Sequence, residues 1–421
     1  MGAKGWNFNE FVRLTQKLRV TVNRVGPQYQ TPVDKAFIES CAKTFDIPQV
    51  NDFNKEIVKS GYLKPSTGFI SISHDPTNGY RSSASTAYIH PILEGKELRP
   101  NLTILTNTWV EKINIRDGRA TGISVRYASG RRTELRAKIE IILSAGSIDT
   151  PRLMLLSGLG PRQQLEDLGI HVIMDLPGVG ENLMDHPETI VMWEMKEPLP
   201  PNCINHSEAA MLLRREPYNA NGDDTDIVDT LFHMFSICFD HNVGRMGYEC
   251  PKNAYCMIPN IPRPRSRGRM YLVSPDPQVK PAIDFRYLSD PDKYDQESLV
   301  FMVKASREMA KQAPFRDYIK REVAPGPKVQ TDAAIAEYNR LAHNTVYHPC
   351  GTTKIGNFDT DPMAVVDPEL RVRGIKGLRI ADAGVFPIIP SINPMLTVLA
   401  VGEKAAELIA KDGQFYSVAH I

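Results

Sequence analysis

The clearest helical pattern in the chain lies near its C-terminus. Apolar and small residues follow one another there at helical spacing: Met395, Val398, Leu399, Gly402, Ala405, Ala406 and Ile409. Pro394 suits the first helical position, and Asp412 with Gly413 suits the end. The pattern therefore predicts a helix with Asn393 at its N-terminus. Since a helix N-terminus carries a partial positive charge and unpaired N–H groups, it favours a ligand that becomes negative.

A short strand is expected just before this helix, over residues 377–381. It would deliver Asp382 and Ala383 at its carboxyl end, where open α/β sheets hold ligands. We therefore expect a flat ligand to bind against the surface that the strand, the turn, Asn393 and the helix form together.

Other elements follow from the same patterns. Helical periodicity covers residues 8–20, 33–45 and 295–311. Alternation between turn signals predicts strands over 102–115, 121–128 and 133–143, joined as a β-meander at Asp117-Gly118 and Ser129-Gly130. The last strand ends in three apolar residues, 141–143, which predicts burial on both faces in a mostly parallel sheet.

A compact helix is expected directly after this strand. Thr150 fits its N-cap, Pro151 its first position and Gly158 its end. Residues 191–340 are richer in proline and contain short strand patterns at 190–193 and 271–274, which indicates a second domain inserted into the first.

Charge and composition narrow the function classes. Lys and Arg number 50 against 49 Asp and Glu, a net charge of +1, so nothing favours nucleic acid or a membrane surface as partner. Six scattered cysteines show no metal-binding spacing. The first 30 residues lack an apolar signal core, and no run of about 20 apolar residues is present, which slightly favours the cytoplasm. The oligomeric state is not indicated.

His348 and Asn393 are the candidate catalytic residues. An imidazole can take a proton near neutral pH, whereas an amide can only orient a substrate by hydrogen bonding. A histidine alone is more often structural, and an asparagine before a helix is more often a cap. Cys350 beside His348 could suggest a thiol nucleophile, but no second base and orienting group accompany it.

Two motifs give this region a specific resemblance. His348-Pro349-Cys350-Gly351-Thr352 and Asn393-Pro394-Met395 resemble the two catalytic motifs of the glucose-methanol-choline (GMC) family of FAD-dependent alcohol oxidoreductases. Residues 146–160 resemble the family's second sequence motif, and residues 180–187 resemble its G-x-N-L-x-D-H segment. A histidine paired with an asparagine is similar to the usage in the choline-oxidising branch.

The resemblance implies a function and a site. It implies FAD as cofactor and a small-molecule alcohol as substrate, whose CH–OH group is oxidised to a carbonyl. His348 would be the base and Asn393 would orient the alcohol oxygen. The implied FAD contacts are Val110 at the adenine, together with Asp382, Ala383, Pro394 and Met395. The helix after Asn393 would stabilise the reduced flavin.

The resemblance also implies a mixed α/β fold with α+β character. It predicts an incomplete FAD-binding, Rossmann-like domain with an inserted substrate domain built on an antiparallel sheet. The expected segments are 1–79 as a partial substrate and flavin-cover region, 80–190 in the FAD-binding domain, 191–340 as the substrate domain, and 341–421 as the C-terminal FAD-binding segment. Because no G-x-G-x-x-G turn is present, we expect only the C-terminal portion of the family fold, without the dinucleotide-binding βαβ unit.

Two other classes of function remain open at this stage, because one fold hosts many functions. One is a flavin-free remnant of the fold that serves as a binding or interaction partner. The other is a lyase or cyclase that holds flavin without using it for redox chemistry.

Overall fold

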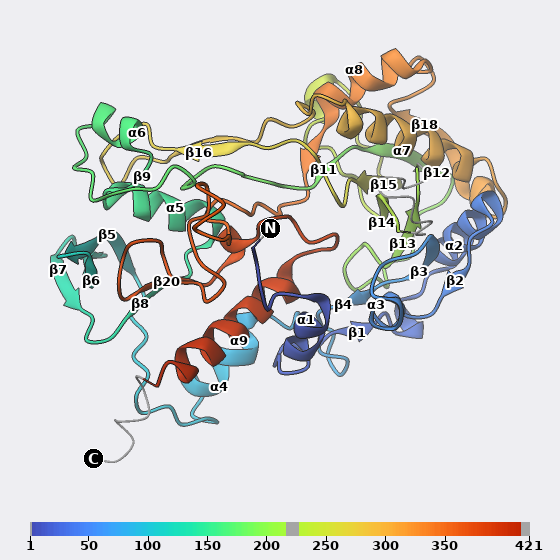
Figure 1. The fold of residues 1–421 in the computed structure, drawn as a ribbon. Helices are drawn as coiled ribbons and strands as arrows, with labels where there is room; N and C mark the ends of the chain where they lie inside the picture. Colours follow the sequence, from blue (N-terminus) through green and yellow to red (C-terminus); the bar gives the residue numbers. More distant parts are fainter. Residues whose placement is uncertain (1, 216–226, 414–421) are drawn as a thin grey trace.

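The computed structural model describes residues 2–215 and 227–413, and its largest sheet there has nine strands (Figure 1). The strands are β2 (Gln49–Val50), β3 (Ser66–Phe69), β11 (Pro187–Glu188), β12 (Val191–Met195), β13 (Ala209–Leu213), β14 (Thr230–Phe235), β15 (Ala254–Asn260), β18 (Ile319–Ala324) and β19 (Asn344–Thr345). The main path runs β18-β12-β15-β14-β13-β3-β2, with β11 and β19 attached at β15. Only the β2–β3 pair is parallel, so the predicted antiparallel sheet is confirmed.

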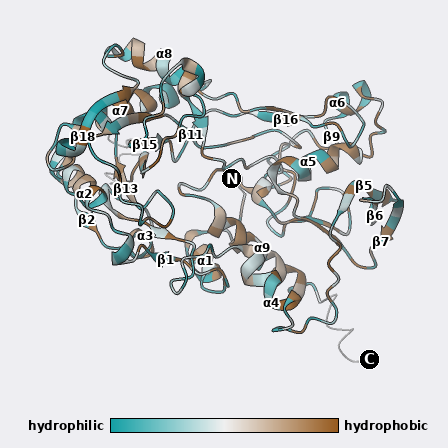
Figure 2. Ribbon diagram, turned by 180° about the vertical axis from the view of Figure 1, so that it is seen from behind, coloured by the Kyte–Doolittle hydropathy of each residue, from teal (hydrophilic) through white to brown (hydrophobic). Residues whose placement is uncertain are grey.

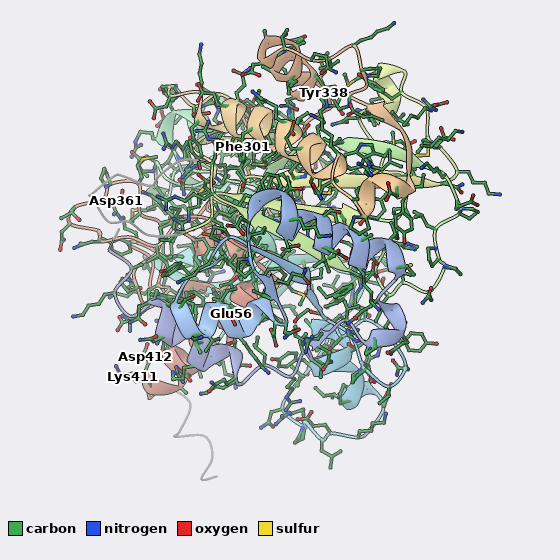
Figure 3. The ribbon with its side chains drawn as sticks, turned by 90° about the vertical axis from the view of Figure 1, so that its right-hand side faces the viewer. Glu56, Phe301, Tyr338, Asp361, Lys411 and Asp412 are labelled. Carbon is green, nitrogen blue, oxygen red and sulfur yellow. A yellow bond between two sulfur atoms is a disulfide. The ribbon has the colours of Figure 1, made fainter. Side chains whose placement is uncertain are left out.

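Helices α2 (Pro32–Phe45) and α7 (Tyr294–Ala310) cover one face of this sheet. Phe37 of α2 and Leu299 of α7 join Trp193, Phe232 and Tyr255 of the strands in one buried core. Both helices match their predicted ranges within a residue. Figure 3 views the molecule from this side, with Phe301 of α7 and Tyr338 of α8 (Asp332–Ala342) labelled. Hydrophobic and hydrophilic residues are mixed along α2 and α7, as expected for helices with one buried face (Figure 2).

The predicted meander forms a separate three-stranded sheet of β5 (Thr108–Arg116), β6 (Arg119–Tyr127) and β7 (Arg132–Arg136). Asp117 and Gly118 have φ values of 49° and 69°, as a tight hairpin turn requires. Two boundaries were wrong. Residues 102–107 precede β5, and the predicted strand 133–143 divides into β7 and β8 (Ile141–Leu143).

Strand β8 pairs in parallel with β20 (Leu378–Ile380), which confirms both the parallel arrangement and the strand before Asp382. The expected burial on both faces was wrong, because Ile142 is 39% exposed. The side chain of Ile142 therefore lies on a face of β8 that the described residues leave partly uncovered.

Helix α5 (Gly146–Leu156) starts five residues earlier than predicted. Thr150 is therefore inside the helix and is not its N-cap. Its hydroxyl oxygen accepts from the N–H of Ala145 at 3.0 Å and donates to Asp382 Oδ2 at 2.6 Å, which joins the start of α5 to the end of β20. Threonine therefore suits this position inside the helix, because its hydroxyl group accepts one hydrogen bond and donates another.

Helix α9 (Met395–Lys411) begins one residue later than predicted, with Pro394 in the cap position. Helix α1 (Phe8–Thr15) ends earlier than the predicted 8–20 pattern and lies along α9. Arg13 of α1 forms an ion pair with Glu407 of α9 at 2.6 Å, and Lys404 of α9 pairs with Glu10.

The remaining elements are short. They are β1 (Asn23–Arg24), α3 (Phe53–Ser60), β4 (Ser71–Ile72), α4 (His90–Leu93), β9 (Leu159–Gly160), α6 (Arg162–Asp167), β10 (Met174–Asp175), β16 (Arg269–Tyr271) and β17 (Ala282–Asp284). The strand predicted at 271–274 is displaced, because β16 ends at Tyr271. Cys238 and Cys250 form a disulfide. Among the described residues, none of the helices has the length and apolar character needed to span a bilayer.

Candidate active site

A cavity of about 1030 Å³ brings most of the predicted site residues together. His348, Asn393, Asp382, Ala383, Pro394 and Met395 all line it. Val110 does not line the cavity; it lies on β5 and packs against the hydrophobic core around α5. The other walls come from the N-terminal segment 70–84, helix α3, and the face of the nine-stranded sheet that α2 and α7 leave uncovered.

His348 contacts a second buried histidine. Its Nδ1 lies 2.9 Å from Nδ1 of His186, and the two rings meet edge to face with centroids 5.0 Å apart. The carboxylate of Asp185 holds both residues, because it accepts from the backbone N–H of His186 at 2.9 Å and of His348 at 2.8 Å. Tyr287 and Thr345 donate their hydroxyl groups to the other oxygen of Asp185. Asp185 is thus a buried anchor with four donors.

Backbone geometry explains the residue types around His348. Tyr347 has a positive φ of 64°, and its N–H donates to Thr345 Oγ1 at 2.7 Å. Gly351 has a φ of +91°, and a Cβ there would lie 2.6 Å from the carbonyl oxygen of Asn182. Because only glycine tolerates both conditions, the last position of the H-P-x-G pattern has to be glycine.

Burial keeps both imidazoles neutral. Desolvation lowers the pKa of His348 to about 3, and His186 adds to the shift. Desolvation likewise lowers the pKa of His186 to about 4, against the carbonyl groups of Pro262 and Pro390, which raise it. A histidine that accepts a proton has to be neutral first, and this environment keeps His348 neutral.

Asn393 and the start of α9 form the opposite wall of the cavity. Asn393 is exposed to the cavity, and no side chain caps α9. The N-terminal N–H groups of a 17-residue helix therefore open into the cavity without a capping side chain. This is a fitting place for the part of FAD that gains negative charge on reduction.

Both oxygens of the Asp382 carboxylate accept hydrogen bonds from other residues of the protein. Its Oδ2 accepts from Gly146 N–H at 3.0 Å and from Thr150, and its Oδ1 accepts from Gly384 N–H at 2.8 Å. Burial raises the pKa of this carboxyl. Asp382 holds the carboxyl ends of β8 and β20 beside the start of α5, where Gly146, Ser147 and Ala383 line the cavity. This is the place where open α/β sheets hold ligands, as the sequence predicted.

Three site residues carried no predicted role. His186 matched a motif but had no assigned contact. Glu188 and His233 line the cavity, on β11 and β14, whereas His186 does not line it and reaches the site through its contact with His348. Burial raises the pKa of Glu188 to about 8, and its carboxylate accepts a hydrogen bond from the Asn344 amide at 3.2 Å. Glu188 directly follows residues 180–187, which resemble a family motif, and this position next to the motif was the signal that could have indicated it.

Cys350 does not serve as a nucleophile here. Its side chain is fully buried, and burial raises the pKa of the thiol well above its ordinary value. A thiol that cannot ionise is inert, which agrees with the sequence argument against a thiol mechanism.

Comparison with known proteins identifies the family. Two family models described as GMC oxidoreductase match, one for the N-terminal domain at residues 1–188 and one for the C-terminal domain at residues 264–402. Choline oxidase from Arthrobacter globiformis is 37% identical over 97% of this chain and 74% of its own length. An oxygen-dependent choline dehydrogenase from Rhizobium rhizogenes (strain K84 / ATCC BAA-868) is 34% identical over 97% of this chain and 76% of its own length.

A solved structure agrees with these matches. Pyridoxine 4-oxidase from "Mesorbium loti" superposes with a TM-score of 0.81 at 26% identity, covering 93% of this chain and 72% of the other. The predicted fold class, with an FAD-binding part and a substrate domain, is thereby confirmed.

The predicted extent of the family fold was wrong. The chain is not a C-terminal portion of the family alone, because the N-terminal domain model matches residues 1–188 and the chain carries that FAD-binding part. The error came from treating the absence of one glycine-rich motif as the absence of the domain that usually carries it. The predicted FAD-dependent alcohol oxidoreductase activity is confirmed at the level of the family. The chain belongs to the GMC oxidoreductase family, whose members are flavoproteins that act on alcohols.

Proposed function

We propose that His348 and Asn393 carry out the alcohol oxidation of this chain. His348 Nε2 would take the hydroxyl proton, and the Asn393 amide would hold the alcohol oxygen by a hydrogen bond. FAD, when bound, supplies the acceptor for the hydride that leaves the carbon. Both side chains line one cavity, and neither His348 Nε2 nor the Asn393 amide has a hydrogen bond within the described residues. The proposal rests on this observation, because both groups are left free to bind the hydroxyl group of a substrate.

The contact with His186 supports the assignment of the base. A neutral imidazole has one N–H, so one ring must donate and the other accept at the 2.9 Å contact between the two Nδ1 atoms. His186 Nε2 is buried and makes no hydrogen bond within the described residues, but the nearby carbonyl groups of Pro262 and Pro390 favour an N–H there over a lone pair. His186 Nδ1 would then accept from His348 Nδ1–H. His348 Nε2 is left as an acceptor facing the cavity, as a base requires.

The described residues also offer a seat for FAD. The flat ring system would lie against Ala383 and the start of α9 at Pro394 and Met395, with Asp382 fixing the turn behind it. Val110, on β5 beside a β-bulge, would contact the adenine through its backbone. In this arrangement residues 80–190 and 341–421 form the FAD-binding domain, residues 191–340 form the substrate domain, and residues 1–79 cover the flavin and part of the substrate.

Choline is the substrate we propose to test first. Two relatives are named for choline oxidation, and choline carries a positive ammonium group that a buried site must balance. Glu188 and Asp382 are the carboxylates that line the cavity in the described residues. Asp382 is occupied by three donors, whereas Glu188 has Asn344 alone, so Glu188 is the carboxylate left to face the ammonium. The positive charge of a bound ammonium would favour the ionised form of Glu188, against the burial that raises its pKa.

Anaerobic addition of choline to the purified holoenzyme tests the proposal. The visible absorbance of bound oxidised flavin should fall as the alcohol is oxidised. Glu188→Gln should raise the choline concentration needed for half-maximal reduction by about tenfold or more, since the negative charge that faces the ammonium is lost. An absorbance that no alcohol changes would instead support a non-redox lyase or cyclase on this fold.

A further inference from the structure

The cavity wall on the large sheet changes character from polar to apolar along one row of residues. Glu188 of β11 is in register with Asn260 of β15, Asn260 with Leu231 of β14, and Leu231 with Leu212 of β13. Residues in register on neighbouring strands project to the same face of a sheet. Glu188, Leu231 and Leu212 accordingly all line the cavity.

A second row repeats this gradient. His233 of β14 is in register with Ala210 of β13, and both residues line the cavity. With strands about 4.8 Å apart, Leu231 lies about 10 Å and Leu212 about 14 Å from Glu188 across the sheet. The carboxylate therefore stands at one end of an apolar wall.

Side chains from outside the sheet extend this wall into a lobe. Phe53, Leu63, Ala210, Leu212 and Leu231 are each less than 10% exposed and form one hydrophobic cluster, with Ile57, Ile70 and Ile392 packed against it. All eight of these residues also line the cavity. Ile392 precedes Asn393, so the apolar lobe starts beside the proposed catalytic asparagine.

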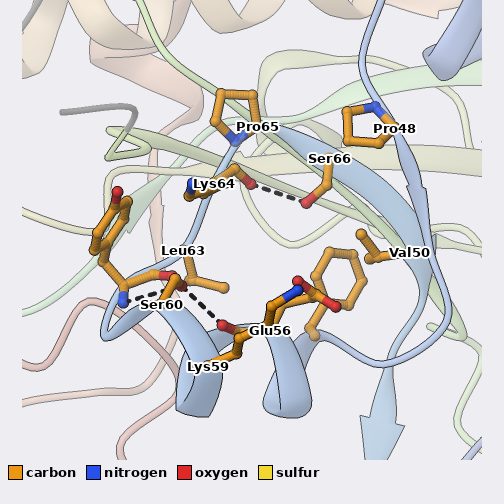
Figure 4. Close-up of a pocket in the computed structure, with 11 residues that line it drawn as sticks. Pro48, Val50, Glu56, Lys59, Ser60, Leu63, Lys64, Pro65 and Ser66 are labelled. Atoms are coloured by element: carbon orange, nitrogen blue, oxygen red, sulfur yellow. Dashed lines mark hydrogen bonds between the residues drawn. The ribbon is translucent and has the colours of Figure 1, made fainter. Parts of the chain in front are cut away.

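The lobe ends at Phe53 and Leu63. These two residues also line a second, outer pocket of about 370 Å³ between α3 and the segment 62–66 (Figure 4). The outer pocket carries charged residues, Glu56, Lys59 and Lys64, which suits a surface in contact with water. Phe53 and Leu63 thus separate an apolar interior lobe from a polar exterior pocket.

We propose that the alcohol bound in this cavity carries an apolar chain on its ammonium group. The inference rests on the proposed function: the carbinol lies at His348 and Asn393, and the ammonium lies against Glu188. The chain then runs over Leu231 and Leu212 toward Phe53 and Leu63. A trimethylammonium group alone would leave that lobe unfilled, and an apolar cavity without a partner forfeits dispersion contacts.

Binding of alkyltrimethylammonium ions to the holoenzyme tests the lobe without any need for oxidation. In calorimetry with butyl, hexyl and octyl members, affinity should rise with chain length, by up to about fourfold per methylene. Ala210→Leu, which fills the lobe, should lower affinity for the hexyl ion by about tenfold or more. It should leave affinity for tetramethylammonium nearly unchanged.

A second variant and a matched control complete the experiment. Phe53→Ala opens the end of the lobe, so affinity should keep rising at chain lengths where the parent protein levels off. Val58→Ala, on the same helix but 58% exposed and outside both pockets, should behave as the parent. An affinity that does not depend on chain length, or that these lobe variants leave unchanged, would overturn the proposal. If affinity rises with chain length but the holoenzyme does not oxidise choline, the result supports the apolar lobe and contradicts the proposed function.

Discussion

Two buried carboxylates three residues apart have different surroundings. Asp185 accepts four hydrogen bonds, whereas Glu188 has Asn344 as its side-chain donor. Burial with a single side-chain donor favours the neutral acid, so the pKa of Glu188 rises to about 8. The sequence predicted His348 and Asn393 from their local motifs. It could not show that His186 touches His348, because 162 residues separate them and only the fold brings them together.

The raised pKa of Glu188 makes a prediction for stability. Its stabilising contribution is complete below the ordinary pKa of about 4.5 and is lost as pH rises through about 8, because unfolding releases the proton. Between these values Glu188 should lower the free energy of unfolding by about 1.4 kcal/mol per pH unit. Urea unfolding at pH 5 to 8 should therefore show a shallower pH dependence in Glu188→Gln than in the parent. Parallel curves would mean that Glu188 is ionised when folded.

The histidine pair makes a prediction for the pH dependence of flavin reduction. The pKa values of about 3 for His348 and about 4 for His186 keep both rings neutral well below pH 6.5. With saturating alcohol, the reduction rate should stay nearly constant from pH 8 down to about 5 and fall only as pH approaches these values. A rate that halves near pH 6.5 would show that His348 titrates as an ordinary solvent-exposed imidazole.

At the scale of elements, the sequence predicted α2, α7 and α9 because their apolar periodicity is long and their ends carry proline or glycine signals. It failed for α5 because Thr150-Pro151 imitates a helix start. The true start at Gly146 is set by Asp382, a residue distant in the sequence that bonds Gly146 and Thr150. Hydrogen bonds to a residue distant in the sequence thus determine where α5 starts, and the local cap signal at Thr150 does not.

The N-terminus of α9 makes the element-scale prediction. Asn393→Asp should reduce the rate of flavin reduction severely, because a carboxylate at the positive end of the helix would oppose the negative charge that FAD gains. Pro394→Ala should be mild, because Pro394 offers no N–H or side-chain hydrogen bond to lose. Stopped-flow reduction of both variants compares them directly. Equal losses would argue against the cofactor seat at this helix.

At the scale of the whole molecule, residues from both family domains build the cavity. His74, Gly146 and Glu188 come from the part matched by the N-terminal domain model, and His348 and Asn393 come from the part matched by the C-terminal model. The sequence motifs predicted the strand before Asp382, and they indicated the two residues that we propose as catalytic, which line the cavity. The apolar lobe could not be predicted, because it depends on the register of β13, β14 and β15.

The central claim is that His348 takes the hydroxyl proton during alcohol oxidation. The most direct test is anaerobic stopped-flow reduction of the bound flavin by choline, comparing the parent protein with His348→Ala. The variant should reduce its flavin about 10²–10⁴-fold more slowly while keeping FAD bound, because a general base acts on the transition state and not on cofactor affinity. His171→Ala, at an exposed histidine outside the cavity, serves as the control and should match the parent. A His348→Ala rate within a few-fold of the parent would contradict the account.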